Sequence, residues 1–200
     1  MNDVTDQVET DVRERILTTA ERLFREIGYQ KTTVADIARE LRMSPANVYR
    51  FFDSKKSINA GVARRLMGEV EQASQKIASG KMGAATERLR ALLATIHRMN
   101  SGRYVADSKM HDMVAAAMEE DWDVCKAHME CIIGTIAAVI ADGVASGEFR
   151  VADVNAAAHC TCAAMARFFH PQLIADCADK PEPTLDQMID FVIASLTRQG

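Results

Sequence analysis

Cysteine is sparse in this chain, and its arrangement provides no disulfide framework. The 200 residues contain five cysteines, an odd number, at spacings that do not form pairs. A disulfide-rich secreted scaffold is therefore excluded. No apolar run approaches the ~20 residues that cross a bilayer, and the acidic start, with Asp3, Asp6 and Glu9, is unlike a signal peptide. We expect a cytoplasmic protein without a membrane partner.

The residue groups that usually mark an enzyme are also missing. The five histidines are scattered, no Ser/His/Asp or Cys/His set can be assembled, and no glycine-rich phosphate loop is present. The cysteines and histidines that come nearest to a metal site have a Cys-x-Cys spacing, unlike the Cys-x-x-Cys of structural zinc sites. These residues are Cys125, His128, Cys131, His159, Cys160 and Cys162. We therefore predict a protein that is not an enzyme, with no catalytic residue, no metal and no cofactor.

Strand patterns are absent, and the periodicity is helical throughout. Apolar residues recur at spacings of three and four over residues 12–27, and Gly28 is expected to end that helix. A second helix is expected after Thr33 as its cap, and a third, of seven or eight residues, after Ser44 and the proline that follows it. The pattern predicts a three-helix unit with a helix-turn-helix over about 33–52.

The charge is unevenly distributed along the chain. The net charge is −4, yet residues 11–60 hold ten Lys and Arg against seven Asp and Glu. Residues 1–10 and 61–200 are both acidic on balance. A basic segment on an acidic chain suits a domain that meets a polyanion. Because the predicted helix-turn-helix lies inside this segment, nucleic acid is the expected partner.

The third predicted helix has little apolar surface, and its outward residues suit DNA. In a helix-turn-helix the second helix enters the major groove, about 12 Å wide, while nearby groups bind phosphates. Asn47 can pair with an adenine edge, and Ala46 can touch a thymine methyl group. Tyr49 and Arg50 can reach a phosphate or a base edge, and the starts of the second and fourth helices attract anions. The alternative is a helical hairpin with solvated polar groups that binds no DNA.

These features lie in one run, "RILTTAERLFREIGYQKTTVADIARELRMSPANVYRFFDSKKSI". It strongly resembles the N-terminal DNA-binding domain of the TetR family of bacterial transcriptional regulators. The shared pattern comprises Ala20, Leu23, Phe24, Gly28, Tyr29, Thr32, Thr33, Val34, Ile37, Ala38, Ser44, Val48, Tyr49, Phe51, Phe52, Ser54 and Lys55. The resemblance implies DNA contacts at seven positions, and we add the turn residue Arg42 and Pro45. The predicted DNA-binding residues are Thr33, Arg42, Ser44, Pro45, Ala46, Asn47, Tyr49, Arg50 and Lys55.

Two positions depart from the family pattern. Arg42 stands in the turn where the family often has glycine, and a left-handed backbone there would cost a non-glycine residue about 1 kcal/mol. Its guanidinium could instead add a phosphate contact. The pair Ala46-Asn47 replaces the Gly-Thr or Gly-Ser common in the family. The fold assignment is unaffected, but no operator sequence can be transferred.

The rest of the chain is also predicted to be helical. The expected helices are 54–77, 84–99, 107–118, 120–145, 151–170 and 184–196, which gives about nine in total. This matches the all-α regulatory domain that the TetR resemblance implies. We expect a DNA-binding domain over 1–55 and a ligand-binding and dimerisation domain over 56–200.

Methionine and aromatic residues cluster in this second part. They predict either an ordinary core or a flexible apolar cavity, because methionine adapts to irregular spaces. The candidate ligand-binding residues are Met99, Met110, His111, Val114, Met118, His128, Phe168 and Phe169.

The expected assembly is a homodimer. The stretch "AAAHCTCAAMA" gives one helix a surface of small side chains, and the last helix is apolar nearly all round. Alternatively, both helices close the monomer's core. The resemblance implies a ligand-responsive regulator, and we expect a dimeric repressor released from a palindromic double-stranded operator by a small, largely apolar effector. The alternatives are a helical enzyme or carrier with a vestigial DNA-binding domain, and a cysteine-based redox or metal sensor.

Overall fold

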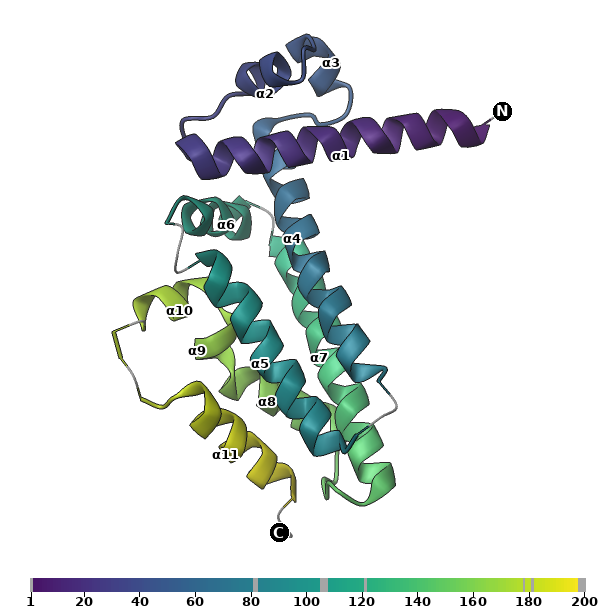
Figure 1. Ribbon diagram of the computed structural model, residues 1–200, viewed down its shortest axis with the longest axis vertical. Helices are drawn as coiled ribbons and strands as arrows, with labels where there is room; N and C mark the ends of the chain where they lie inside the picture. The colour runs from purple at the N-terminus through teal and green to yellow at the C-terminus, as the bar shows by residue number, and fades with distance from the viewer. Residues whose placement is uncertain are drawn as a thin grey trace. The chain divides into compact units, whose positions relative to one another are not determined.

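All regular secondary structure in the described part of the chain is helical (Figure 1). The computed structural model describes residues 2–80, 83–104, 108–120, 122–177, 179–180 and 182–197, and none of these forms a strand. The helices are α1 (Asn2–Ile27), α2 (Val34–Glu40), α3 (Pro45–Tyr49), α4 (Lys55–Ala78), α5 (Ala85–Tyr104), α6 (Ser108–Glu120), α7 (Trp122–Ser146), α8 (Val154–Ala164), α9 (Ala166–Phe169), α10 (Pro171–Asp176) and α11 (Leu185–Thr197). The all-α prediction is confirmed, with eleven helices in the described residues rather than about nine.

The chain divides into two compact units. Unit 1 comprises Met1–Leu66 and Asp107–Val124, and unit 2 comprises Met67–Ala106 and Cys125–Gly200. Unit 1 holds α1–α3, the start of α4 and α6, whereas α5, most of α7 and α8–α11 lie in unit 2. The boundary predicted after residue 55 separates two functions, whereas the two units are defined by their contacts. It therefore stays a prediction.

The single helix expected over 151–170 is broken, which accounts for the additional helices. α8 and α9 separate at Met165, whose ψ of 0° departs from helical geometry. His170 is extended, as the residue before a proline tends to be. Pro171 then occupies the first position of α10, where its missing N–H costs nothing. The helix does end just before Pro171, as predicted, whereas the break at Met165 and the helix that begins at the proline were not predicted.

Two other helices are longer than expected. α1 begins at Asn2 and not at residue 12. α5 continues to Tyr104, through the polar stretch that was expected to end it. Asn100 in that stretch is 7% exposed, and its Nδ2 donates to the Phe169 carbonyl oxygen at 2.9 Å. A residue that suggests a helix end is instead packed against α9. In the predicted break after α4, Lys81 and Met82 lie outside the described residues.

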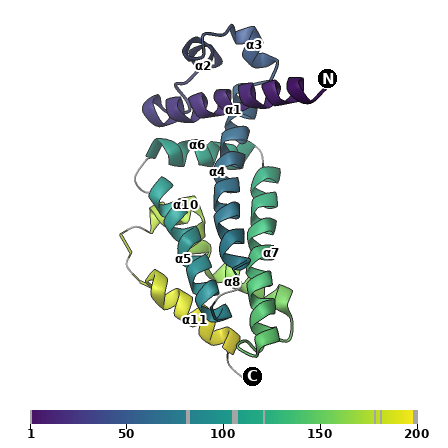
Figure 2. The same ribbon diagram turned by 45° about the vertical axis from the view of Figure 1, so that its right-hand side comes forward.

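The core of unit 2 lies between α4, α5, α7, α8 and α11 (Figure 2). Its fully buried side chains include Leu89, Leu92, Leu93, Ile136, Val139, Ile140, Met165 and Ile189. Phe168 belongs to the same cluster, with Met99 and Phe169 packed against it. Three of the candidate ligand-binding side chains therefore contribute to a packed core.

α7 is unusually apolar for a surface helix. By length and composition it is the one helix among the described residues that could cross a membrane, and 39% of its apolar window is buried. No membrane-spanning segment was expected from the sequence, yet α7 is long and apolar enough to be one. A core helix passes the same test, and Ile132, Ile136 and Val139 of α7 lie in the core of unit 2. α7 is therefore weak evidence for a membrane partner.

The turn after α7 supports α5 through a carboxylate. Gly147, with φ of 81°, ends α7. Glu148 then accepts hydrogen bonds from the backbone N–H groups of Ala85 at 2.9 Å and Thr86 at 3.0 Å. These are the first N–H groups of α5, which have no partner within their own helix. The same hydrogen bonds lower the Glu148 pKa from 4.5 to about 2.

We expect Glu148→Gln to lower stability at neutral pH and to flatten the acid side of the stability profile. Because the folded-state pKa is depressed, the carboxylate's contribution is complete above about pH 4.5 and is lost as the pH falls towards about 2. Urea denaturation midpoints measured across that range will test this. The control is Glu130→Gln, on the exposed side of α7. If wild type and Glu148→Gln lose stability in parallel with falling pH, Glu148 is not the group responsible.

The same turn also packs an aromatic ring against α7. Phe149 is 2% exposed, and its backbone N–H donates to the Gly143 carbonyl oxygen at 3.0 Å. The next N–H, of Arg150, donates to the Leu196 carbonyl oxygen of α11 at 2.8 Å. One short turn thereby connects α5, α7 and α11.

Candidate DNA-binding site

α1 is the base on which the helix-turn-helix of unit 1 rests (Figures 1 and 2). Its inward side chains are fully buried: Ile16, Ala20 and Phe24. Gly28 ends the helix as predicted, with φ of 95°. Near the other end, Arg13 Nη1 donates to the Phe51 carbonyl oxygen at 2.7 Å, and its guanidinium lies 4.5 Å from the centre of the Phe52 ring. α1 therefore holds the segment that follows α3.

The predicted cap at the start of α2 is confirmed. The Asp36 N–H donates to Thr33 Oγ1 at 3.1 Å, and Asp36 Oδ2 accepts from the Thr33 N–H at 3.0 Å, which is a capping box. The Thr33 hydroxyl also donates to Asp36, and these contacts lower the Asp36 pKa. The start of α2 is thus fixed by its own side chains.

The turn between α2 and α3 has a left-handed backbone at Arg42. Arg42 has φ of 55°, the one positive φ at a non-glycine residue in the described chain. Met43 N–H donates to the Ala38 carbonyl oxygen at 2.9 Å, across the left-handed residue. The strain expected at Arg42 is therefore present, and its side chain is exposed.

α3 is shorter than expected, with five residues, Pro45–Tyr49, and not seven or eight. Ser44 caps it by accepting from the Asn47 N–H at 3.2 Å. The chain turns out of the helix directly afterwards, where the Phe52 N–H donates to the Val48 carbonyl oxygen at 3.1 Å. The cap and the proline start were predictable from local residues, whereas the early end was not.

The two sides of α3 differ in burial. Val48 is completely buried, and it attaches α3 to the base. Ala46 and Arg50 are exposed, Tyr49 is 49% exposed, and Asn47 is half-buried. α3 therefore presents a small apolar group, an amide, a phenol and a guanidinium together. This combination suits base edges, methyl groups and phosphates.

Nine of the ten basic residues of this segment fall into two groups. Five of the ten are engaged within the protein: Arg13, Arg22, Arg25, Arg39 and Lys55. Within the described chain, four exposed side chains make no hydrogen bond or ion pair: Arg15, Lys31, Arg42 and Arg50. Arg25 and Arg39 pair with carboxylates three or four positions away, whereas the partners of Arg13 and Lys55 are distant in sequence. The second group is the one able to contact phosphate directly.

Lys55 was expected at a phosphate, and the structure gives it internal partners. Its Nζ donates to the carbonyl oxygens of Tyr29 at 3.0 Å and Gln30 at 3.4 Å. It also lies 4.4 Å from the centre of the Tyr29 ring. Ser54 and Ser57 cap the start of α4 reciprocally, at 3.1 Å in each direction.

The candidate ligand-binding residues are divided between the two units. Met110, His111, Val114 and Met118 lie on α6 in unit 1, and Met99, His128, Phe168 and Phe169 lie in unit 2. Met110 and Val114 are fully buried. His128 Nδ1 lies 2.7 Å from Glu71 Oε1, in an interaction between α7 and α4. Their role in binding a ligand stays a prediction.

The sequence analysis missed an open groove of about 850 Å³ in unit 2. Its walls come from α4, α5 and α7, with Gln75, Ala78, Ser79, Arg88, Glu130, Cys131, Gly134, Thr135, Ala138 and Asp142. Arg88 Nη1 donates to Asp142 at 2.9 Å, which closes one end with an ion pair. Because these residues come from three separate helices, no sequence spacing could have indicated the groove.

The cysteines show little sign of reactivity. Burial raises the pKa values of Cys131 and Cys162, which disfavours the reactive thiolate. Cys131 Sγ accepts a hydrogen bond from Gln75 Nε2 at 3.4 Å. In the part of the chain that the structure describes, no three His, Cys, Asp or Glu side chains are grouped to hold a metal ion. Neither sensor alternative gains support from these residues.

A short stretch of the chain is similar to a curated protein. The Biofilm operon icaADBC HTH-type negative transcriptional regulator IcaR of Staphylococcus aureus (strain Newman) is 45% identical over 47 residues. These residues are 24% of this chain and 25% of that protein, so the chain matches about a quarter of the relative's length.

Solved structures share the fold over nearly the whole chain. A TetR/AcrR-family transcriptional regulator from Thermobifida fusca has a TM-score of 0.64 at 24% identity, covering 94% of this chain and 97% of that one. SmeT, the repressor of the Stenotrophomonas maltophilia multidrug efflux pump SmeDEF, has 0.66 at 20%, covering 94% and 91%. FadR from Bacillus subtilis in complex with stearoyl-CoA has 0.64 at 15%, covering 92% and 97%. At these identities the likeness shows the fold alone.

Family models match both parts of the chain. Residues 16–62 match "Bacterial regulatory proteins, tetR family", which covers the helix-turn-helix. Residues 85–189 match "Tetracyclin repressor-like, C-terminal domain", which covers more than half of the chain. The capped helices, the left-handed turn and the exposed side of α3 lie inside the first match. The chain therefore belongs to the TetR family of bacterial transcriptional regulators.

Proposed function

We propose that this protein is a dimeric, cytoplasmic repressor that binds a palindromic operator and releases it when a small, largely apolar effector binds. The observation that carries the proposal is the exposed side of α3, where Ala46, Tyr49 and Arg50 surround a half-buried Asn47. The unpaired cations around it supply attraction to phosphate. The negative regulation stated for IcaR, which is 45% identical over 47 residues, favours a repressor.

The proposed division of labour follows the sequence prediction. Residues 1–55 bind DNA, and residues 56–200 bind the effector and form the dimer. The DNA contacts are proposed at Thr33, Arg42, Ser44, Pro45, Ala46, Asn47, Tyr49 and Arg50, whereas Lys55 has partners within unit 1. Ser44 and Thr33 stand at helix starts, where unpaired N–H groups favour phosphate.

The effector is proposed to be largely apolar. The candidate ligand-binding positions are mostly methionine, valine and phenylalanine, with His111 and His128 as the polar groups. FadR from Bacillus subtilis, which shares the fold, is described in complex with stearoyl-CoA, a ligand with a long apolar chain. Its fold likeness makes a similar ligand class reasonable to test first.

One selection experiment tests the whole proposal. The purified protein is incubated with a random duplex pool, with and without metabolite extract, and the bound sequences are determined. The expected result is a palindromic consensus that is enriched less strongly when the extract is present, because effector and operator oppose each other's binding. Failure to enrich any sequence at low salt would reject DNA binding.

We expect Asn47→Ala to relax base preference at one position of each half-site. Losing a bidentate contact to a base costs about 1–3 kcal/mol. Stability should change little, since alanine favours the helix at least as well. Repeating the selection with the variant measures the effect, and Gln72→Ala, an exposed amide on α4, is the control. An unchanged consensus would remove Asn47 from the residues that contact bases.

A further inference from the structure

We propose that Lys55 is a positioning residue for operator binding, which fixes the α1–α2 loop and through it α2 and α3, and is not a phosphate contact. This inference rests on the proposed DNA-binding function. The Lys55 amine already has three partners within unit 1: two carbonyl oxygens, at 3.0 Å and 3.4 Å, and the face of the Tyr29 ring. Two of the three ammonium protons therefore have acceptors within unit 1, and the charge lies over an aromatic face.

The partners of Lys55 are groups that need a cation. Tyr29 and Gln30 lie just beyond the C-terminal end of α1, where the helix dipole favours positive charge. The aromatic face adds a cation–π attraction. Moving the amine to a DNA phosphate would break both of these hydrogen bonds and the contact with the ring. The internal position is therefore favoured over a direct phosphate contact.

The Tyr29 ring makes this attachment rigid. Tyr29 is 3% exposed, and its ring meets Phe24 edge to face at 5.3 Å between ring centres. Phe24 is itself completely buried in the base formed by α1. Lys55, the first residue of α4, is thereby tied to a fixed point of the core of unit 1.

The attachment reaches the DNA-binding helices through a short, constrained loop. Thr32 is completely buried, and both its hydroxyl and its N–H donate to the Gly28 carbonyl oxygen, at 2.8 Å and 3.2 Å. Thr33 follows immediately and caps α2. Only Gln30 to Thr32 separate the Lys55 attachment from the cap of α2. A substitution at Lys55 that displaces this loop is therefore expected to shift the start of α2. α2 then carries α3 across the Arg42 turn.

Arg13 provides a second attachment of the same kind at the other end. It joins a carbonyl oxygen and an aromatic ring, those of Phe51 and Phe52, just after α3. Two cations therefore hold the entry to α2 and the exit from α3. Arg42, which is exposed and unpaired in the described chain, has the opposite character and serves as the matched comparison.

The test measures operator affinity and affinity for unrelated duplex DNA over about 50–200 mM salt, for wild type, Lys55→Ala, Lys55→Gln and Arg42→Ala. We expect Lys55→Ala to bind the operator roughly tenfold more weakly, the scale of one lost charge-assisted hydrogen bond, with an unchanged salt slope. Affinity for unrelated DNA should stay the same. Lys55→Gln should recover part of the loss, because a neutral amide can still donate to the carbonyl oxygens.

Other outcomes would overturn the proposal. A direct phosphate contact predicts that both Lys55 variants lose about one unit of salt slope and weaken on all sequences alike, as Arg42→Ala is expected to do. A purely structural role predicts a lower melting temperature with unchanged operator affinity for the folded protein. Should Lys55→Ala not fold, the slope and sequence dependence of Lys55→Gln decide between the roles. A wild type that enriches no duplex would instead reject DNA binding itself.

Discussion

Gly143→Ala is expected to destabilise the protein by about 3 kcal/mol, because a single methyl group there has no room. A Cβ atom at this position would lie 2.1 Å from Phe149 Cδ2 and 2.6 Å from Cε2. The ring cannot move away easily, because Phe149 is 2% exposed and its backbone N–H donates a hydrogen bond to the Gly143 carbonyl oxygen. Either α7 or the turn that connects α5 and α11 must shift.

Gly134→Ala on the same helix is the matched control. A Cβ atom there meets nothing within 4 Å, so alanine should stabilise α7 by up to about 1 kcal/mol through its helix propensity. Urea denaturation at one fixed protein concentration measures both variants, because the stability of a dimer depends on concentration. Destabilisation of the two variants by equal amounts would show that contact with Phe149 is not the cause.

A double variant tests the contact directly. Phe149→Leu alone should cost stability by leaving space in the core of unit 2. When it is combined with Gly143→Ala, the smaller side chain makes room for the methyl group. The double variant should therefore lose less stability than the two single variants lose together. Full additivity would contradict the packing described for this turn.

The helix-turn-helix was predictable because its determinants are local. Thr33 and Ser44 cap their helices through residues three positions further on, and such spacing is visible in the sequence. Arg42 stands where the family often has glycine, which tolerates a left-handed backbone, and Arg42 adopts that backbone with φ of 55°. Only the length of α3 was overestimated, because apolar residues after Tyr49 continue the helical pattern although the chain leaves the helix.

The features that were missed depend on residues far apart in sequence. Lys55 and Arg13 both counted as positive charge for DNA, whereas their partners are Tyr29 and Phe51, 26 and 38 positions away. Asn100 lies in a polar stretch that suggests a helix end, but its amide donates a hydrogen bond to α9. Sequence spacing reports the face on which a residue lies but not what covers that face.

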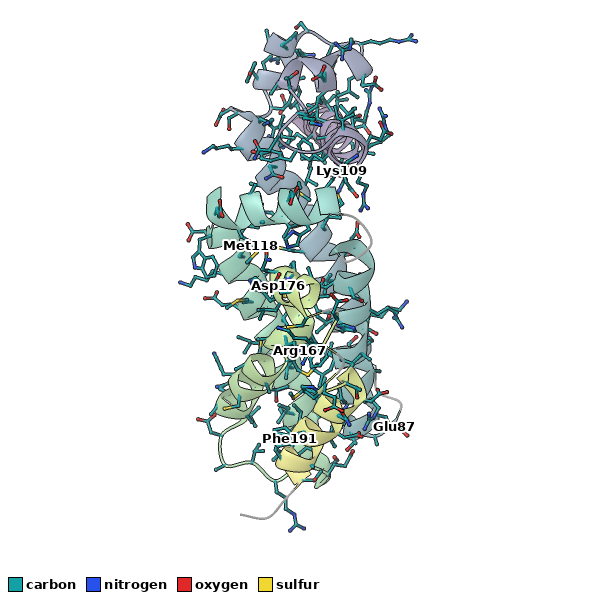
Figure 3. The ribbon with its side chains drawn as sticks, turned by 90° about the vertical axis from the view of Figure 1, so that its left-hand side faces the viewer. Glu87, Lys109, Met118, Arg167, Asp176 and Phe191 are labelled. Carbon is teal, nitrogen blue, oxygen red and sulfur yellow. The ribbon has the colours of Figure 1, made fainter. Side chains whose placement is uncertain are left out.

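Phe191→Glu is expected to separate the proposed dimer and to weaken operator binding by about 100-fold or more. Phe191 lies on α11 (Figure 3) and is 66% exposed, while Ile189, Val192 and Leu196 of the same helix are buried. A large exposed aromatic side chain on an otherwise packed helix is a typical anchor for a partner surface. α8 exposes the small side chains proposed to lie beside it, with Ala156, Cys160 and Ala163.

The loss of affinity follows from the geometry of a palindrome. A dimer places two copies of α3 about 34–36 Å apart, or a multiple of that distance, so binding one half-site holds the second copy at the other. A monomer loses this effective concentration, and each half-site then binds alone. Sedimentation measures the assembly, and Leu173→Glu, at a 39% exposed position on α10, is the control. If Phe191→Glu remains dimeric, α11 does not form the interface. If it becomes monomeric yet binds the operator unchanged, the two half-sites are not bound together and the palindrome is not needed.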